Sequence, residues 1–278
     1  MELVAAEQVE PGIVLVTLDR PERRNALSGR MLAELHQLFD RIAGEPATRV
    51  VVVTGAGESF CAGADMKADA GDEPEPDAVP IAGLGSRAVG TTARTMAAQE
   101  LMASLFEKVH RLRQPVIAAV NGAAVGGGFA FALACDIRFA DTAGRFGAVF
   151  IRHGVSACDM GTSYFLPRLV GASRSAELLL TGRVFDAAEA ADMGLVLEVV
   201  PVGSVVERAL ETARLIAANG PLAVWMTKET MWQTLDAPSL RHALDMENRT
   251  QVLCASTGEL AGSFAAFREG RSPEWQPL

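Results

Sequence analysis

The sequence has few cysteines, few aromatic residues and no long apolar run. Only 6% of its 278 residues are aromatic, and its four cysteines show no spacing typical of a metal site or a redox pair. Reduced thiols in a cytoplasmic protein are the simplest interpretation. No apolar stretch is long enough to span a bilayer, and Met1–Val4 lacks the basic region that opens a signal peptide. We therefore expect a cytoplasmic protein without a membrane span.

Positive charge is also scarce. Lysine and arginine total 25 against 34 aspartates and glutamates, a net charge of −9 that disfavours a nucleic-acid partner. The sequence has no P-loop and no G-x-S-x-G motif, and Gly55-Ala56-Gly57 lacks the third glycine of a dinucleotide-binding fingerprint. We expect no metal, because the histidines lie far apart and in no ligand-spaced motif; they are His36, His110, His153 and His242.

The hydrophobic pattern predicts alternating strands and helices. Strands are expected at Gly12–Asp19, Val50–Thr54 and Val116–Val120, with helices at Met31–Ile42 and Leu101–Leu112. This alternation favours an α/β fold with a mainly parallel sheet. After Pro201 the pattern is helical, with helices expected at 204–219, 224–235, 240–253 and 259–267. Ser204 is the expected N-cap of the first, with Glu207 as its capping-box partner.

The most informative stretch is Ala118–Ala134, in which an apolar strand runs into Gly126, Gly127 and Gly128 and then into an apolar helix. Glycines let another group approach the backbone closely. The first amides of a helix lack internal partners, and the helix dipole adds positive potential there. Such a turn suits an anion or a developing oxyanion. A tight turn packed against a neighbour is the alternative, with equal weight.

A second loop of small residues, Ser59–Lys67, follows the strand at Val50–Thr54. Two such loops can each donate one N–H to a single oxygen, which is the geometry of an oxyanion hole. A third segment, Asp19–Leu27, ends a strand and enters a helix.

These three segments, in this order and spacing, resemble the crotonase (enoyl-CoA hydratase/isomerase) superfamily. The matches are Arg20-Pro21 with Asn25-Ala26-Leu27, Phe60 to Asp65, Asn121 to Gly128, and Cys135-Asp136 to Ala140. The resemblance covers nearly the whole chain and is specific to the superfamily, not to one reaction. It implies a crotonase-like spiral core of ββα units at residues 1–203 and a C-terminal helical region at 204–278. That region would serve oligomerisation, in a homotrimer or dimer of trimers, and cover the site.

The resemblance also implies the site residues. The Ala64 and Gly127 N–H groups would be the oxyanion donors for a CoA thioester. Coenzyme A would be part of the substrate, with no separate cofactor, in a role in fatty acid metabolism. The residues expected to bind CoA are Arg23, Arg24, Ala26, Ala62 and Asp65. The two arginines would contact the phosphates, and Ala62 and Asp65 would line the adenine pocket. For the arginines, plain surface exposure is the alternative. Phe264 and Phe267 are candidates for covering the CoA site, or else simple core anchors.

The sequence departs from the family at the two glutamates that hydratases use. The matching positions are Ala130 and Phe150, and neither side chain can move a proton. Asp159 remains, just before a helix expected at Met160, in a region where dienoyl-CoA isomerases and chlorobenzoyl-CoA dehalogenases carry a functional aspartate. The alternative role for Asp159 is an N-cap. We expect a lyase or isomerase of the enoyl-CoA hydratase type that stabilises a thioester enolate and uses either Asp159 or no acid/base pair. A non-catalytic acyl-CoA carrier or sensor is the alternative function.

One further segment stands apart. Asp69–Asp77 is acidic and Pro-rich, and Ile81–Thr92 continues it with small residues. This composition disfavours a packed element. We predict a mobile flap over the acyl site, with a plain surface insertion as the equally weighted alternative.

Overall fold

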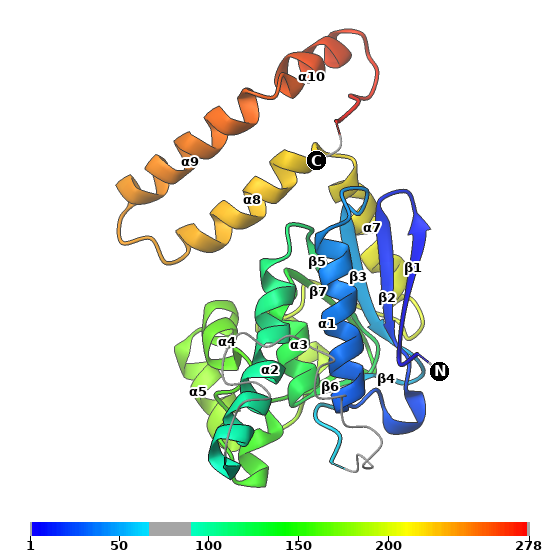
Figure 1. Cartoon of the computed structure of the whole chain (residues 1–278), viewed down its shortest axis with the longest axis vertical. Helices are drawn as coiled ribbons and strands as arrows, with labels where there is room; N and C mark the ends of the chain where they lie inside the picture. The colour runs from blue at the N-terminus through cyan, green and yellow to red at the C-terminus, as the bar shows by residue number, and fades with distance from the viewer. Residues whose placement is uncertain (1, 67–89, 277–278) are drawn as a thin grey trace.

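The computed structural model describes residues 2–66 and 90–276, and its core is a sheet with strand order β1-β2-β3-β5-β7-β10 (Figure 1). β1 (Val4–Glu10) pairs antiparallel with β2 (Ile13–Leu18). The remaining neighbours all pair in parallel; they are β3 (Val50–Gly55), β5 (Val116–Val120), β7 (Ile137–Asp141) and β10 (Val199–Val200). The predicted parallel α/β core is confirmed.

Helices cover both faces of this sheet, which explains why its central strands are apolar without alternation. Val51 and Val53 of β3 face a cluster that includes α1 (Gly29–Ala43) and α2 (Thr91–Arg111). Val50 and Val52 face a second cluster with α7 (Val205–Ala217). Successive strand residues point to opposite faces, so one run of valines serves two cores.

A second, smaller sheet has the order β4-β6-β8-β9. Its strands are β4 (Ser59–Cys61), β6 (Ala123–Val125), β8 (Arg145–Gly147) and β9 (Phe185–Asp186). The chain passes from a strand of the large sheet to a strand of the small one and then to a helix, as in β5, β6 and α3 (Gly127–Ala134). The same succession, β3 to β4 to α2, precedes it. The predicted spiral of ββα units is therefore confirmed.

The other described elements of the core are short. η1 (Pro21–Arg23), a 3₁₀ helix, follows β2. The 3₁₀ helix η4 (Val149–His153) and the helices α4 (Thr162–Val170) and α5 (Ala172–Thr181) lie between β8 and β9, and α6 (Ala187–Asp192) follows β9. Within residues 2–66 and 90–276, no helix is both long and apolar enough to cross a membrane.

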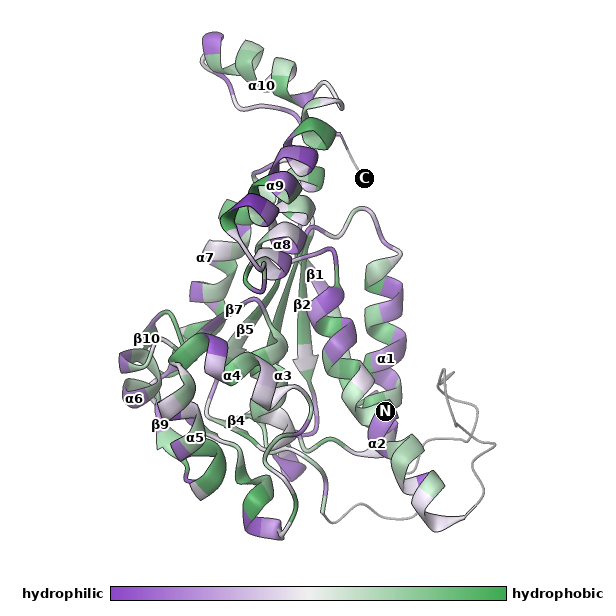
Figure 2. Cartoon of the chain, turned by 90° about the vertical axis from the view of Figure 1, so that its left-hand side faces the viewer, coloured by the Kyte–Doolittle hydropathy of each residue, from purple (hydrophilic) through white to green (hydrophobic). Residues whose placement is uncertain are grey.

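Three helices project from the core as an arm: α8 (Pro221–Thr234), α9 (Leu240–Ala255) and α10 (Glu259–Arg268) (Figure 1). α9 buries none of its described residues. Figure 2 shows stretches of hydrophobic residues along α9 and α10. The exposed large apolar side chains of these helices are Leu240, Leu244, Val252, Leu253, Leu260, Phe264 and Phe267. The predicted division at residues 203 and 204 stays a prediction, and α7, beyond it, packs on the sheet of the core.

Several local predictions were wrong. The Ser204 side chain makes no capping hydrogen bond, because its backbone (φ −103°, ψ −8°) is already helical whereas an N-cap is normally extended. α2 begins at Thr91 rather than Leu101. β1 was not predicted at all. The predicted flap at 69–92 lies outside the described residues except for 90–92, where α2 begins.

Candidate functional site

The loop after β4 and the turn before α3 meet backbone to backbone. Gly63 has φ +85°, and a Cβ there would lie 2.8 Å from the Val125 carbonyl oxygen and 2.9 Å from the Gly127 nitrogen. A Cβ at Gly128 would lie 2.0 Å from the Cys61 carbonyl oxygen. All three separations are too short for a real side chain, so glycine is required at Gly63 and at Gly128. The structure thus brings together the two glycine loops that the sequence predicted to cooperate.

The Ala64 N–H takes no part in the short parallel pairing between Leu27 and the loop after β4. The Leu27 N–H donates to the Gly63 carbonyl at 2.7 Å, and the Asp65 N–H donates to the Leu27 carbonyl at 3.0 Å. In a parallel pairing of this kind, the residue between the two bonded groups turns its own N–H to the other side. Ala64 is exposed, and none of the described residues accepts its N–H.

The Gly127 N–H belongs to the first residue of α3 and takes no part in the hydrogen bonds within that helix. Gly126, with φ +55°, is the N-cap, and its carbonyl accepts the Ala130 N–H at 3.0 Å. Gly127 is the first helical residue, so its N–H has no intrahelical acceptor and lies at the positive end of the helix dipole. Among the described residues no acceptor is paired with it.

Apolar side chains surround this turn. Leu27 Cδ1 and Met160 Sδ lie 3.2 and 3.4 Å from where a Cβ at Gly127 would stand, and Phe150 Cε1 lies 3.8 Å from the equivalent point at Gly126. Ala130 is fully buried in α3. Ala130 and Phe150 are therefore apolar and lie inside or beside the site, and their correspondence to the glutamates of hydratases stays a prediction.

Asp159 lies one residue before Met160, which contacts the Gly127 turn. Its Oδ1 accepts the Met160 N–H at 2.7 Å and the Gln99 Nε2–H at 2.5 Å. The helix expected at Met160 begins instead at Thr162, with Gly161 as its N-cap and no side-chain cap. The predicted helix start was wrong, and Asp159 does not cap α4. Its catalytic assignment stays a prediction.

The residues assigned to CoA binding gather around the same loop. The buried Arg20 guanidinium pairs with Asp65, and both side chains are less than one-tenth exposed. The Ala62 N–H donates to the Arg24 carbonyl at 3.0 Å, and Ala26 is buried beside them. Asp65 thus holds Arg20 in place, a role that the sequence did not predict.

The two arginines assigned to the CoA phosphates differ in exposure. Arg24 is exposed, whereas Arg23 is partly buried. The CoA assignments of Arg23, Arg24, Ala26, Ala62 and Asp65 stay predictions.

Two asparagines of the motifs build the turns around the site. The buried Asn25 accepts the Arg20 N–H at 2.9 Å and donates to the Ser59 carbonyl at 2.6 Å. Asn121 accepts the Gly55 N–H at 3.1 Å and donates to the Gly55 carbonyl at 2.6 Å. These amides replace backbone partners where strands end, so their part in the motif is architectural.

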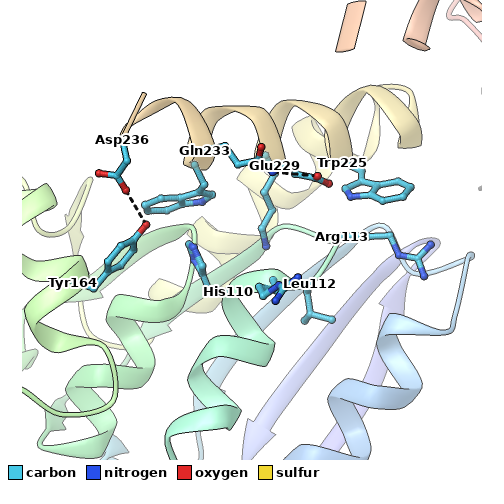
Figure 3. Close-up of a pocket in the computed structure, with 11 residues that line it drawn as sticks. His110, Leu112, Arg113, Tyr164, Trp225, Glu229, Gln233 and Asp236 are labelled. Atoms are coloured by element: carbon cyan, nitrogen blue, oxygen red, sulfur yellow. Dashed lines mark hydrogen bonds between the residues drawn. The ribbon is translucent and has the colours of Figure 1, made fainter. Parts of the chain in front are cut away.

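A groove of about 540 Å³ lies elsewhere, between α8, the end of α2 and α4 (Figure 3). Beside it Lys228 Nζ pairs with Asp136 at 2.7 Å, and Trp232 Nε1–H donates to the same carboxylate at 3.0 Å. The His110 ring lies 4.6 Å from the Trp232 ring, centroid to centroid. These contacts attach the arm to the core. The groove shares no lining residue with the two glycine turns.

The fold and the site together define a class of α/β proteins: two sheets are built from ββα units, and where two loops touch, two backbone N–H groups have no acceptor among the described residues. The chain belongs to the enoyl-CoA hydratase/isomerase family, whose model matches residues 8–277. A probable enoyl-CoA hydratase of Mycobacterium leprae is 39% identical over 254 residues, which cover 91% of this chain and 83% of that protein.

Solved structures agree with this assignment. The crystal structure of an enoyl-CoA hydratase from Bacillus anthracis has a TM-score of 0.86 and 36% identity, and the match covers 98% of each chain. That of a probable enoyl-CoA hydratase/isomerase from Mycobacterium abscessus has a TM-score of 0.86 and 35% identity, covering 99% of this chain and 98% of the other.

Sequence reasoning missed Gln99 as a neighbour of Asp159. The two residues are 60 positions apart, and Gln99 lies in a polar stretch of α2 without a clear apolar stripe. Nothing in the local sequence pattern indicates this contact.

Proposed function

We propose that this protein binds acyl-CoA thioesters and catalyses proton transfer at the carbon next to the carbonyl, with Asp159 as the base. The Ala64 and Gly127 amides would hold the thioester oxygen as it becomes an enolate oxygen. The observation that supports the proposal is a combination of three features. Two backbone N–H groups have no acceptor among the described residues, apolar side chains surround them, and the Asp159 carboxylate lies one residue before Met160, whose sulfur contacts the Gly127 turn.

The replacement of both hydratase glutamates narrows the reaction. Ala130 and Phe150 cannot activate water, so Asp159 must act without a second carboxylate at those positions. A single carboxylate suits a reaction in which one group removes a proton from a carbon of the substrate and then gives a proton back to the substrate. Protonation of the same carbon results in hydrogen exchange with solvent, and protonation of a different carbon moves the double bond. We therefore favour isomerase chemistry and expect slow hydration of short enoyl-CoA substrates.

The experiment measures deuterium uptake at the α carbon of butyryl-CoA in D₂O by mass spectrometry, and double-bond migration of a 3-enoyl-CoA by absorbance. The test variant is Asp159→Asn, with Asp192→Asn on α6 as a matched control outside the site. We expect the first to lower both rates by at least about 100-fold and the second to leave them unchanged. Equal exchange in wild type and Asp159→Asn would disprove the role of Asp159.

A carrier or sensor is the second candidate, favoured by the apolar Ala130 and Phe150. It predicts that the wild type binds CoA thioesters by calorimetry and shows no exchange or turnover. Crotonyl-CoA hydration at about 10² s⁻¹ or more would contradict both candidates, because it needs the missing glutamates.

The proposal includes three further expectations. Coenzyme A enters as part of the substrate, and no resident cofactor or metal takes part. The exposed apolar side chains of the arm bind other copies of the chain, in a trimer or a dimer of trimers. The protein works in the cytoplasm, in fatty acid metabolism.

A further inference from the structure

Within residues 2–66 and 90–276, Gln99 donates the one side-chain hydrogen bond that the Asp159 carboxylate accepts. We propose that Gln99 is a positioning residue that holds Asp159 in the orientation needed for proton transfer. This inference rests on the proposed function and adds to it a second side chain, from a different helix.

The hydrogen bonds to Asp159 are unevenly shared between its two oxygens. Oδ1 accepts both the Gln99 amide N–H and the Met160 backbone N–H. Oδ2 has no hydrogen-bond partner among the described residues. An ionised carboxylate accepts bonds at both oxygens, so two donors on one of them fix the side-chain rotamer and leave the other to take a proton.

The backbone on both sides of Asp159 is also fixed. The Asp159 N–H donates to Thr162 Oγ1 at 3.1 Å, and that hydroxyl donates to the Ala157 carbonyl at 2.6 Å. Met160 has φ +48°, a left-handed conformation that is uncommon for a residue with a side chain. Its N–H bonds Asp159 while its sulfur lies against the Gly127 turn. The carboxylate is thereby connected to the turn that carries the Gly127 amide.

The helix that carries Gln99 is itself anchored in the core. Leu105, Phe106 and Val109 of α2 are buried, and His36 Nε2 lies 3.1 Å from the Leu101 carbonyl oxygen. Gln99 is exposed and lies before these anchors, so its side chain reaches Asp159 from a fixed helix. Its chemical type fits the role, because an amide donates to a carboxylate without adding a charge that would compete for the substrate's proton.

The test compares two variants of Gln99. Gln99→Met keeps the length of the side chain and removes the donor, and we expect it to lower kcat for butyryl-CoA exchange about tenfold with KM changed less than about twofold. Gln99→Glu places a negative charge beside Asp159, which makes ionisation of its carboxyl less favourable. We expect the acid limb of the pH–rate profile to move up by about one pH unit.

The matched control is Ala98→Glu, which adds the same charge at the neighbouring exposed position of α2. Successive helical positions differ by about 100°, so this carboxylate points away from Asp159, and the pH profile should not move. A wild-type rate and pH profile in both Gln99 variants, with Asp159→Asn inactive, would overturn the role of Gln99 and leave the proposed function standing. Full activity of Asp159→Asn, or an inactive wild type, would overturn both.

Discussion

The α carbon of Gly63 faces the backbone nitrogen of Gly127 so closely that a methyl group on Gly63 would stand 2.9 Å from that nitrogen. At this point the two loops touch through main-chain atoms. Their separation is set by the absence of a side chain at Gly63, and the distance between the N–H groups of Ala64 and Gly127 depends on it.

This contact predicts a large effect of Gly63→Ala. The variant combines a left-handed backbone, φ +85°, with a clash against main-chain atoms that have little room to move. We expect the free energy of unfolding in urea to fall by roughly 3 kcal/mol or more. The control is Gly154→Ala, where φ is +78° and nothing lies within 4 Å of the new methyl group. It should cost about 1–2 kcal/mol for the backbone alone. Equal losses in the two variants would refute the close contact.

The ion pair between Lys228 of α8 and Asp136 of the core should contribute to the free energy of unfolding. Lys228 and Asp136 are both about nine-tenths buried, and Lys228→Met leaves the carboxylate without its cation. We expect the free energy of unfolding to fall by about 3 kcal/mol, because an unpaired buried charge is costly. Arg271→Met removes one partner of the exposed pair with Glu269 and should change stability by less than about 0.5 kcal/mol. Chemical denaturation of both variants measures the difference.

Histidine burial predicts a pH dependence of stability. Burial lowers the pKa of both His110 and His36 below the ordinary value of 6.5. The unfolded chain therefore binds protons more readily, and stability is lost as pH falls through about 6.5. We expect the free energy of unfolding to drop from pH 7.5 to pH 6.0, and to drop less in His110→Phe. His153→Phe, at an exposed position, should keep the wild-type slope. Urea denaturation at both pH values measures this change in the free energy of unfolding. If His110→Phe loses as much stability as the wild type between pH 7.5 and pH 6.0, the prediction for His110 is wrong.

The exposed phenylalanines of α10 predict self-association. Phe264 is 59% exposed and Phe267 is 83% exposed, which is unusual for side chains of this size. We expect the double variant Phe264→Ser with Phe267→Ser to sediment as a smaller species than the wild type. Leu197→Ser, at a 71% exposed apolar position on the core, is the control and should leave the sedimentation coefficient unchanged. A monomeric wild type would contradict the prediction outright.

The parts of the structure that local pattern could predict are those with strong periodicity or a special backbone requirement. α1 was found because its buried residues recur at helical spacing, and the Gly126–Gly128 turn because three glycines join a strand to a helix. β1 was missed because most of its residues are exposed, so no apolar run marks it. The first half of α2 was missed for a similar reason, since Ala97 is its one buried residue before Leu105.

The contacts around Asp159 could not be predicted from the local sequence pattern, for a different reason. The family resemblance predicted that Asp159 lies near the acyl site. The alternative prediction for this residue was the N-cap of a helix. The bond from Gln99 joins residues on separate elements, and the left-handed Met160 shifts the start of α4 to Thr162. Both depend on tertiary packing, which overrides the local preference of an aspartate for a helix start.

The N–H groups of Ala64 and Gly127 belong to the main chain, so a substitution removes one of them only when it introduces proline. Substitutions at neighbouring side chains, such as Ala130 and Phe150, would leave these two N–H groups in place. A descendant can therefore acquire new chemistry by substitution at a few flanking positions without first losing its hold on the ligand.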